Sequence, residues 1–319
     1  MTNAKRFHRR SLLSLAGSLA FCACLPRARA ADRTITVGYT AINEFTGLFV
    51  ARDKGLFEKR GLDVAATLIP NNATIPAALY AGGIQIGTPS VTTLLQAVDG
   101  GMDLQFVCGG GVLSAARPSV GIIVRATDGP DAAAGLIGKR IGVPGLNALF
   151  HVIARRWLSQ NGVDPSKVNF VETPFSQMYD LLRGGQIDVV IAGDPVRSRI
   201  IADGLGKPLG NMLSSVPEGA LSGNYATTAS LAQANPAILS AFRDAIGEAD
   251  QIAAADPSGT LEIVSHYLRL PVDILAKLPP PTLRAQIDRS QIEFWVQVAR
   301  EQGMLRHSVS VEKLLPATS

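Results

Sequence analysis

The segment from Thr34 to Val64 most constrains the fold of this chain, because it reads as strand, loop, helix and strand in succession. A β-branched run, Ile35 to Val37, ends at Gly38, and helix-forming residues then lead to a second apolar run at 64–69. This order predicts a βαβ unit, and therefore a parallel sheet with helices on its faces. Such sheets bind ligands beyond the carboxyl ends of their strands, so we expect the loop 39–47 to border a site.

The first thirty residues are expected to be a secretory signal peptide. Basic residues precede an apolar run, 12–25, that is too short for a permanent transmembrane helix, and Ala28-Arg29-Ala30 forms an A-x-A cleavage site. The pair Arg9-Arg10 leaves open whether export follows the twin-arginine or the Sec route. Cys22 follows a bulky phenylalanine and fits a lipid-attachment site poorly. We expect a periplasmic protein whose residues 1–30 are removed.

The charge balance changes sign without that segment. The whole chain has 30 Lys+Arg and 26 Asp+Glu, but six of the bases and none of the acids precede residue 31, which leaves 24 against 26. A slightly acidic chain gives no indication of nucleic-acid binding. Only Cys108 of the three cysteines lies outside the segment, so no intrachain disulfide is expected. The fold must then depend on its hydrophobic cores.

The opening pattern recurs after about residue 119. A strand is predicted at 120–124 and another at 139–143, and the second ends in a tight turn before a helix over 147–160. If Ile84 is aligned with Ile187, the glycine, isoleucine and polar residues around both positions correspond. The sequence therefore predicts an α/β class with two lobes of one architecture.

Helices dominate the C-terminal part of the chain. Asn235-Pro236 and Asp256-Pro257 are typical helix starts. A last long helix is predicted with one apolar face made by Leu283, Ile287, Phe294 and Val298.

The C-terminal helices have no strands to cover unless they return to the first lobe. We therefore expect a first lobe of residues 31–118 and 224–319 and an inserted second lobe of residues 119–223. The chain would cross between the lobes near Pro118 and Gly223, and two crossings make a hinge.

No catalytic set is visible in the sequence. The histidines beyond the signal segment, His151, His266 and His307, match no metal-binding spacing. His151 is interpreted as a packed or wall residue in preference to a base, and Cys108 as an inert buried thiol. The run 109–111 matches no phosphate-binding pattern and predicts close backbone approach at a strand end.

Polar residues follow several predicted strands and stand at or near helix N-termini. They are Thr46, Ser90, Asn147, Ser176 and Asp194. Unpaired N–H groups and the positive end of the helix dipole favour an anion or a carbonyl there. Ordinary capping is the alternative for each of them. Asp194 differs, because its carboxylate could hold a cationic group or cap its helix.

Several segments resemble the solute-binding components of ABC importers, in the branch that takes up nitrate, sulfonates, taurine and thiamine pyrimidines. These are GYTAINEFTGLFVARDKGLFEKRGLDV, ALYAGGIQIGTPS, GLIGKRIGVPG and LLRGGQIDVVIAGDP, within residues 34–230. The resemblance implies the type II periplasmic binding fold, in which two α/β lobes close on a ligand. It also implies a small-molecule ligand and an inner-membrane permease and ATPase as partners, and a monomer without cofactor or metal.

The resemblance places the ligand between the lobes. The expected contacts are Asn43, Phe45, Thr46, Thr88 and Ser90 from the first lobe, and Asn147, Ser176 and Asp194 from the second. Sulfonate binders of the family carry a hydroxyl residue after the glycine of the second-lobe turn, whereas Leu146 follows Gly145 here. The ligand class therefore stays open among sulfonate, carboxylate and pyrimidine-like molecules.

Two other functions remain alternatives. Enzymes that make the thiamine pyrimidine share this fold, but they resemble a cysteine-rich, histidine-bearing pattern that this chain lacks. A periplasmic sensor, in which the closed lobes address a receptor, is the other alternative. We expect a binding protein and not an enzyme.

Export provides the first test. The A-x-A site predicts a mature chain that starts at Ala31. N-terminal sequencing of the protein from a periplasmic extract should read from this residue. An intact Met1 start in the cytoplasmic fraction would contradict the predicted location.

Overall fold

The structure begins with the strand, helix and strand that the sequence predicts. The computed structural model describes residues 34–315, which belong to one compact unit, and the expected signal peptide lies outside them. The opening elements are β1 (Ile35–Tyr39), the 3-10 helix η1 (Asn43–Phe45), α1 (Thr46–Asp53), η2 (Glu58–Arg60) and β2 (Val64–Leu68). Strands β1 and β2 are parallel, as expected for a βαβ unit.

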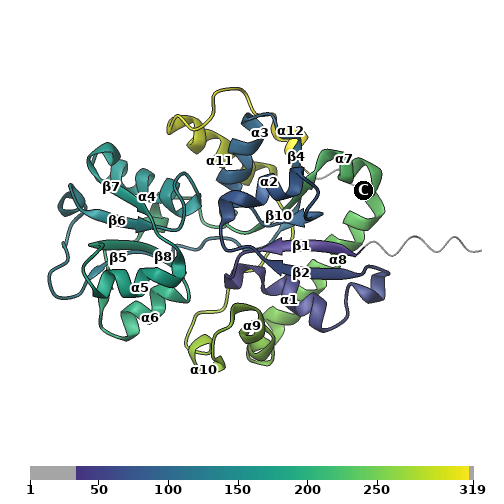
Figure 1. Ribbon diagram of the computed structural model, residues 1–319, viewed down its shortest axis with the longest axis horizontal. Coiled ribbons are helices and arrows are strands. Elements are labelled where there is room, and N and C mark those ends of the chain that lie inside the picture. Colours follow the sequence, from purple (N-terminus) through teal and green to yellow (C-terminus); the bar gives the residue numbers. More distant parts are fainter. Residues whose placement is uncertain (1–33, 316–319) are drawn as a thin grey trace, which may run out of the picture. The chain divides into compact units, whose positions relative to one another are not determined.

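The first sheet combines both ends of the described chain. Its other strands are β3 (Ile86–Gly87), β4 (Leu104–Gly109) and β10 (Asn224–Thr228). The strand order is β2-β1-β3-β10-β4, and β10 runs antiparallel to both of its neighbours (Figure 1). The chain therefore returns to the first sheet after building the second.

The helices outside the second lobe come both before and after the second sheet in the chain. They are η3 (Asn72–Thr74), α2 (Ile75–Tyr80), α3 (Val91–Asp99), α7 (Ala229–Ala234), α8 (Pro236–Ala255), η7 (Ser258–Thr260), α9 (Leu261–Leu268), α10 (Val272–Leu275), α11 (Arg289–Glu301) and α12 (Val311–Leu314). Helices α1 and α8 share one apolar core, in which the rings of Phe57 and Phe242 stack at 5.2 Å. Among residues 34–315, no helix combines the length and apolar character needed to cross a membrane.

The second sheet lies between the two crossings of the chain. Its strands are β5 (Val120–Arg125), β6 (Arg140–Val143), β7 (Asn169–Glu172), β8 (Val189–Gly193) and β9 (Gly206–Pro208), with helices η4 (Ala133–Leu136), α4 (Leu149–Gln160), η5 (Pro165–Lys167), α5 (Phe175–Arg183), α6 (Val196–Ala202) and η6 (Met212–Ser215). The order is β7-β6-β8-β5-β9, in which β6 is parallel and β5 antiparallel to its neighbours. The prediction of two α/β lobes is confirmed. The short strand β9 was not predicted.

Two helix boundaries were wrong. The helix predicted from Asn147 begins two residues later as α4, because Asn147 has a left-handed φ of 60°. The last helix does not include Leu283 and Ile287. A capping box formed by Asp288 and Gln291 starts α11 at the residue after Asp288.

The two crossings, residues 110–113 and 219–223, pair with each other and are called the hinge ribbon below. The amide of Gly110 donates to the carbonyl of Gly223 at 2.8 Å. A third segment lies alongside, since the amide of Val112 donates to the carbonyl of Thr282 at 2.9 Å. The hinge thus contains a third segment in addition to the two crossings that the sequence predicts.

No side chain separates the hinge ribbon from η1. A Cβ atom added at Gly111 would lie 2.9 Å from both Cβ and Cγ of Glu44. One added at Gly223 would lie 3.2 Å from Cβ of Glu44 and 2.9 Å from the amide nitrogen of Gly111. This agrees with the close backbone approach predicted for the run 109–111.

The internal repeat seen in the sequence has a structural counterpart. In the first lobe, Oε1 of Gln85 accepts a hydrogen bond from the amide of Thr36 in β1 at 2.9 Å. In the second, Oδ2 of Asp188 accepts one from the amide of Arg140 in β6, also at 2.9 Å. Each polar side chain, directly after its aligned isoleucine, therefore ties a glycine turn to the start of the neighbouring parallel strand.

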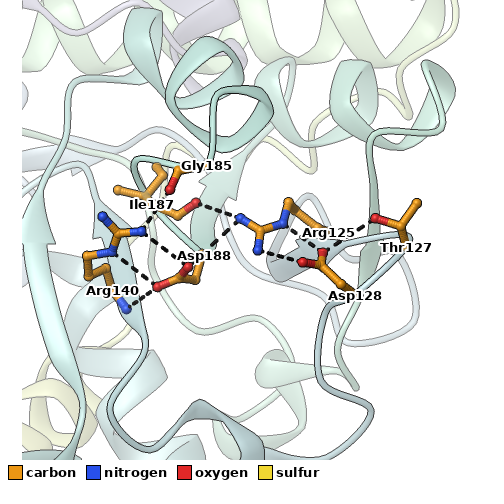
Figure 2. Close-up of polar contacts among 7 residues, drawn as sticks. All are labelled: Arg125, Thr127, Asp128, Arg140, Gly185, Ile187 and Asp188. Atoms are coloured by element: carbon orange, nitrogen blue, oxygen red, sulfur yellow. Dashed lines mark hydrogen bonds and ion pairs between the residues drawn. The ribbon is translucent and has the colours of Figure 1, made fainter.

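Asp188 also organises an ion-pair cluster on the second lobe (Figure 2). Its carboxylate lies 3.3 Å from Nε of Arg140 and 3.9 Å from Nη1 of Arg125. Arg125 in turn donates two hydrogen bonds to Asp128, each of 2.8 Å. Burial acts to raise the pKa of Asp188, but the hydrogen bonds from Arg140 and the two positive charges outweigh it and lower this pKa.

The lobes also meet along α3, α4 and α11. The side-chain amide of Gln302 donates to the carbonyl of Val152 at 2.8 Å, and that of Gln96 donates to the carbonyl of Asn147 at 3.1 Å. One cluster of buried apolar side chains continues through these helices from lobe to lobe. The lobes are therefore joined by packed side chains as well as by the hinge ribbon.

Asp188→Asn should lower the free energy of unfolding by about 1–3 kcal/mol at neutral pH, because two guanidinium groups and a backbone amide lose a charged acceptor. The pKa of Asp188 is lowered in the folded protein, so this stabilisation disappears as the pH falls through the folded value. The free energies of unfolding of wild type and variant, measured with urea, should therefore converge in acid.

Asp180→Asn is the matched control. Asp180 pairs with Arg183 on α5, but its side chain is 69% exposed. An exposed pair contributes little, so this change should stay within about 0.5 kcal/mol. An equal effect of the two substitutions would contradict the role assigned to Asp188.

Candidate ligand-binding site

A pocket of about 270 Å³ opens between loops from both lobes. It is lined by Thr40, Ala41, Ile42, Glu44, Phe45, Leu68, Pro70, Asn72, Thr88, Pro89, Ser90, Pro144, Ala148, Leu149, Phe150, Pro174, Phe175, Ser176 and Ser222. Most of these residues follow β1, β2 and β3 of the first sheet or β6 and β7 of the second. The pocket thus lies at the carboxyl ends of parallel strands, where such sheets bind their ligands.

Hydrogen bonds fix the first-lobe wall of this pocket. Oδ1 of Asn72 accepts from the amide of Ser90 at 2.8 Å, while its Nδ2 donates to the carbonyl of Thr88 at 2.9 Å. Oγ of Ser90 caps α3 by accepting from the amide of Thr93 at 3.2 Å. Asn72 was not among the predicted site residues; its signal was a polar residue in the loop that follows β2.

A buried histidine holds the second-lobe turn. Nδ1 of His151 accepts from the amide of Asn147 at 2.8 Å, and the imidazole packs edge-on against Phe170. Burial, assisted by the charge of Arg155, lowers the pKa of His151 to about 4. The imidazole is therefore neutral at pH 7, which agrees with its interpretation as a packed residue.

Aromatic side chains give the pocket its apolar walls. Phe150 and Phe175 meet edge to face at 6.0 Å in the second lobe. Phe45 contributes from the first lobe and packs against Tyr225 at 5.5 Å. Three phenylalanines around one small pocket suit an apolar or flat ligand.

The predicted site residues divide into three groups. Phe45, Thr88, Ser90 and Ser176 line the pocket. Asn43 and Thr46 line a different cavity of about 610 Å³, next to α8, α9 and α10. Asn147 and Asp194 line neither cavity.

The geometry of Asp194 is that of a local cap. Its Oδ1 accepts from the amide of Ser198 at 3.1 Å and from the hydroxyl of the same residue at 2.6 Å. Arg197 lies 3.9 Å away, and Asp194 is 4% exposed. Burial raises the pKa of Asp194 although Ser198 and Arg197 act in the opposite direction. This carboxylate faces its own helix and not the pocket.

The family model described as "NMT1/THI5 like" matches residues 42–260, more than half of the chain. The chain belongs to this family.

Two curated relatives add detail. A putative ABC transporter periplasmic binding protein from Brachyspira hyodysenteriae is 30% identical over 159 residues, covering 47% of this chain and 46% of the relative. The bicarbonate-binding protein CmpA from Synechococcus elongatus is 25% identical over 292 residues, covering 80% and 61%. The chain thus spans about half to three fifths of the length of these relatives.

Solved structures support the fold. The alkanesulfonate-binding protein SsuA from Xanthomonas axonopodis matches with a TM-score of 0.74 and 21% identity, over 90% of this chain and 98% of that one. The nitrate-binding protein NrtA from Synechocystis matches with a TM-score of 0.74 and 17% identity, over 88% and 84%. The predicted periplasmic binding protein fold is confirmed.

This NMT1/THI5-like protein shows no metal centre in residues 34–315, where no three His, Cys, Asp or Glu side chains are grouped to hold an ion. Cys108 is buried and free, and burial raises the pKa of its thiol well above the usual value. A thiol in this state is a poor nucleophile.

A buried acid lies behind the start of α1. Asp250 is 8% exposed, and neither of its oxygens has a hydrogen-bond partner among the described residues. A Cβ atom added at Gly47 would lie 2.3 Å from its Oδ1. Burial raises the pKa of Asp250 to about 8, while the nearby amide of Ala285 acts in the opposite direction. The carboxyl is therefore mostly protonated at neutral pH.

Asp250→Asn should remove a pH dependence of stability. The folded state binds the Asp250 proton more tightly than the unfolded state, so its contribution is fully present below the unfolded pKa and is lost as the pH rises towards about 8. As the pH rises across this range, the free energy of unfolding of the variant should increase relative to that of wild type by up to about 1.4 kcal/mol per pH unit. Urea unfolding at several pH values measures the difference.

Asp244→Asn, an exposed change on the same helix, is the control. It should alter the free energy of unfolding by less than about 0.5 kcal/mol. If Asp250→Asn loses stability relative to wild type as the pH rises, the protonated state of Asp250 is wrong.

Proposed function

We propose that this chain is the substrate-binding component of an ABC importer, which captures a small organic molecule between its two lobes in the periplasm. The observation that carries the proposal is the pocket lined by strand-end loops of both sheets. Two curated relatives are named as a periplasmic binding protein and a bicarbonate-binding protein, which supports the same function class. An inner-membrane permease and ATPase would be the partners, and the chain would act as a monomer.

The pocket favours binding over chemistry. Glu44 is the single titratable side chain among the described residues that line it. His151 and Cys108 lie outside the lining, and the Ser90 hydroxyl already caps a helix. Among the described residues, the lining contains no histidine, cysteine or lysine, the side chains that most often act as a base or a nucleophile beside serine and acidic residues. We therefore propose a binding protein and not an enzyme.

The proposed mechanism is closure of the lobes on the ligand. The hinge ribbon and the adjoining segment at Thr282 connect the lobes, while α3, α4 and α11 meet beside them. A ligand that contacts both walls would stabilise the closed form, and the permease would recognise that form. The contacts we propose are Phe45, Thr88 and Ser90 from the first lobe, with Phe150 and Ser176 from the second.

Phe150→Ala tests the pocket. The ligand is first found by native mass spectrometry of the purified protein, followed by a thermal-shift panel of sulfonates, carboxylates and aminopyrimidines. Loss of an aromatic wall should weaken binding of the compound so identified by about 1.5–3 kcal/mol. Titration calorimetry gives the affinity.

Leu146→Ala is the matched control, because Leu146 lies in the turn before α4, is 47% exposed and does not line the pocket. The Leu146→Ala variant should bind the identified ligand with the same affinity as wild type. Equal affinities of wild type and Phe150→Ala would exclude the pocket, and conversion of the ligand on standing would exclude a pure binding function.

A further inference from the structure

The pocket has one charged side chain and it is acidic. Among the described residues that line the pocket, Glu44 is the single acid, and none is lysine, arginine or histidine. Glu44 was not among the predicted site residues, although it stands between two of them, Asn43 and Phe45. An anionic ligand would find no cation in this lining.

The position of Glu44 is fixed by the hinge. Its Cβ and Cγ fill the space left by the missing side chains at Gly111 and Gly223. The carbonyl of Glu44 lies 3.1 Å from the position of a Cβ at Gly110. The side chain of Glu44 therefore begins between η1 and both strands of the hinge ribbon, and it lines the pocket from there.

The hydroxyl of Ser222 is available beside it. Ser222 lines the pocket and is 3% exposed, yet its Oγ has no hydrogen-bond partner with acceptable geometry among the described residues. It nevertheless lies close enough to Glu44 to lower the pKa of that carboxyl. A buried hydroxyl without a partner is uncommon and costs stability, which a ligand would restore.

Charged groups around Glu44 are few. A smaller neighbouring cavity is lined by Glu44 and Arg117, but the guanidinium of Arg117 donates to the hydroxyl of Thr282 at 2.9 Å. The hinge-ribbon segments packed against Glu44, residues 110–113 and 219–223, contain no charged side chain, and neither does the stretch 279–282. No ion pair with Glu44 occurs within residues 34–315.

Burial raises the pKa of Glu44 to about 7, and the hydroxyl of Ser222 only partly offsets this. A cation in the pocket would supply the positive charge that the lining lacks, and it would favour the ionised form of the Glu44 carboxylate. An anion at about 4 Å would instead be repelled by about 4 kcal/mol at an effective dielectric constant of about 20. The phenylalanine walls favour a cation as well, since aromatic faces attract positive charge.

We propose that the pocket selects a small organic nitrogen cation, an amine or amidine on an apolar or aromatic body, through Glu44 and Ser222. This inference rests on the proposed function and chooses one ligand class for the same pocket. The nitrogen donates hydrogen bonds to the Glu44 carboxylate and the Ser222 hydroxyl, and the body contacts Phe45, Phe150 and Phe175. Because Glu44 touches both hinge strands, the bound cation lies where closure can respond to it.

The test compares probes of one size and different charge. Benzamidine and benzylamine are the cations, benzoate and benzenesulfonate the anions, and benzyl alcohol the neutral molecule. Titration calorimetry should show the cations binding at least about tenfold more tightly than the anions, which corresponds to about 1.4 kcal/mol. Between about pH 8.5 and about pH 5.5 their affinity should fall by about tenfold or more, because protonation of Glu44 removes the ion pair.

Glu44→Gln keeps the size of the side chain and removes its charge. The variant should bind benzamidine about tenfold or more weakly than wild type, and this affinity should no longer depend on pH. The difference in affinity between cations and anions should also become smaller. Ser222→Ala provides a second variant that keeps the carboxylate, and it should weaken benzamidine binding by a smaller factor. Glu262→Gln, an exposed change on α9, controls for the overall charge and should bind like wild type.

The outcomes separate the two proposals. Anions that bind wild type more tightly than cations, and lose affinity in Phe150→Ala, would overturn the cation class but leave the binding function intact. Unchanged benzamidine affinity in both Glu44→Gln and Ser222→Ala would overturn the assignment to these two residues. Failure of both cations to bind folded wild type would overturn the cation class, and the binding function would then be decided by the ligand panel described above.

Discussion

The contact on which the site depends is the close approach of η1 to the hinge ribbon. Gly111 and Gly223 leave room for Glu44, and any larger residue at Gly111 would put a Cβ atom within 2.9 Å of that side chain. The pairing of the two crossings requires the same closeness, because the amide of Gly110 donates to the carbonyl of Gly223. The glycines of the hinge ribbon therefore allow the two crossings to pair, and they also leave the space for Glu44 beside the pocket.

The two lobes use the same device to hold their strand ends in place. Gln85 and Asp188 each accept a hydrogen bond from the first residues of the adjacent parallel strand. The difference between them is charge: the amide in the first lobe needs no counter-ion, whereas the carboxylate in the second gathers Arg125 and Arg140 (Figure 2). Equivalent positions of a repeat can thus keep a structural role while their chemistry diverges. The motif aspartate serves the fold and lies outside the pocket lining.

Most of the fold could be predicted because its signals are local. Alternating or β-branched runs, glycine stops and Asn-Pro or Asp-Pro starts each act within a few residues, and they indicated both sheets and most helices. The errors came from non-local effects. Leu283 fits a helical face in sequence, but the backbone there pairs with Gly111 of the hinge ribbon. Asn147 is held in a left-handed turn by His151 four residues later.

The candidate site was harder to predict than the fold, because a polar residue at a helix N-terminus has two uses that look alike in sequence. Asp194 turns its carboxylate back onto Ser198, and Thr46 donates its hydroxyl to the carbonyl of Asn43. Oδ1 of Asp194 and the hydroxyl of Thr46 are therefore already paired within their own elements. Glu44 carried no such signal, since its environment is made by glycines far away in the chain.

Selectivity in such a pocket must come from the groups that the fold leaves without partners. Thr88 accepts from the amide of Thr40 and Ser90 from that of Thr93, so the fold already supplies each of these oxygens with one partner. Ser222 and Glu44 differ, because the Ser222 hydroxyl is buried without a well-formed hydrogen bond and Glu44 has no ion-pair partner among the described residues. The same packing that allows the two lobes to join thus places a buried hydroxyl beside the one acid among the described lining residues of the pocket, and these are the two groups through which we propose that the pocket selects a cation.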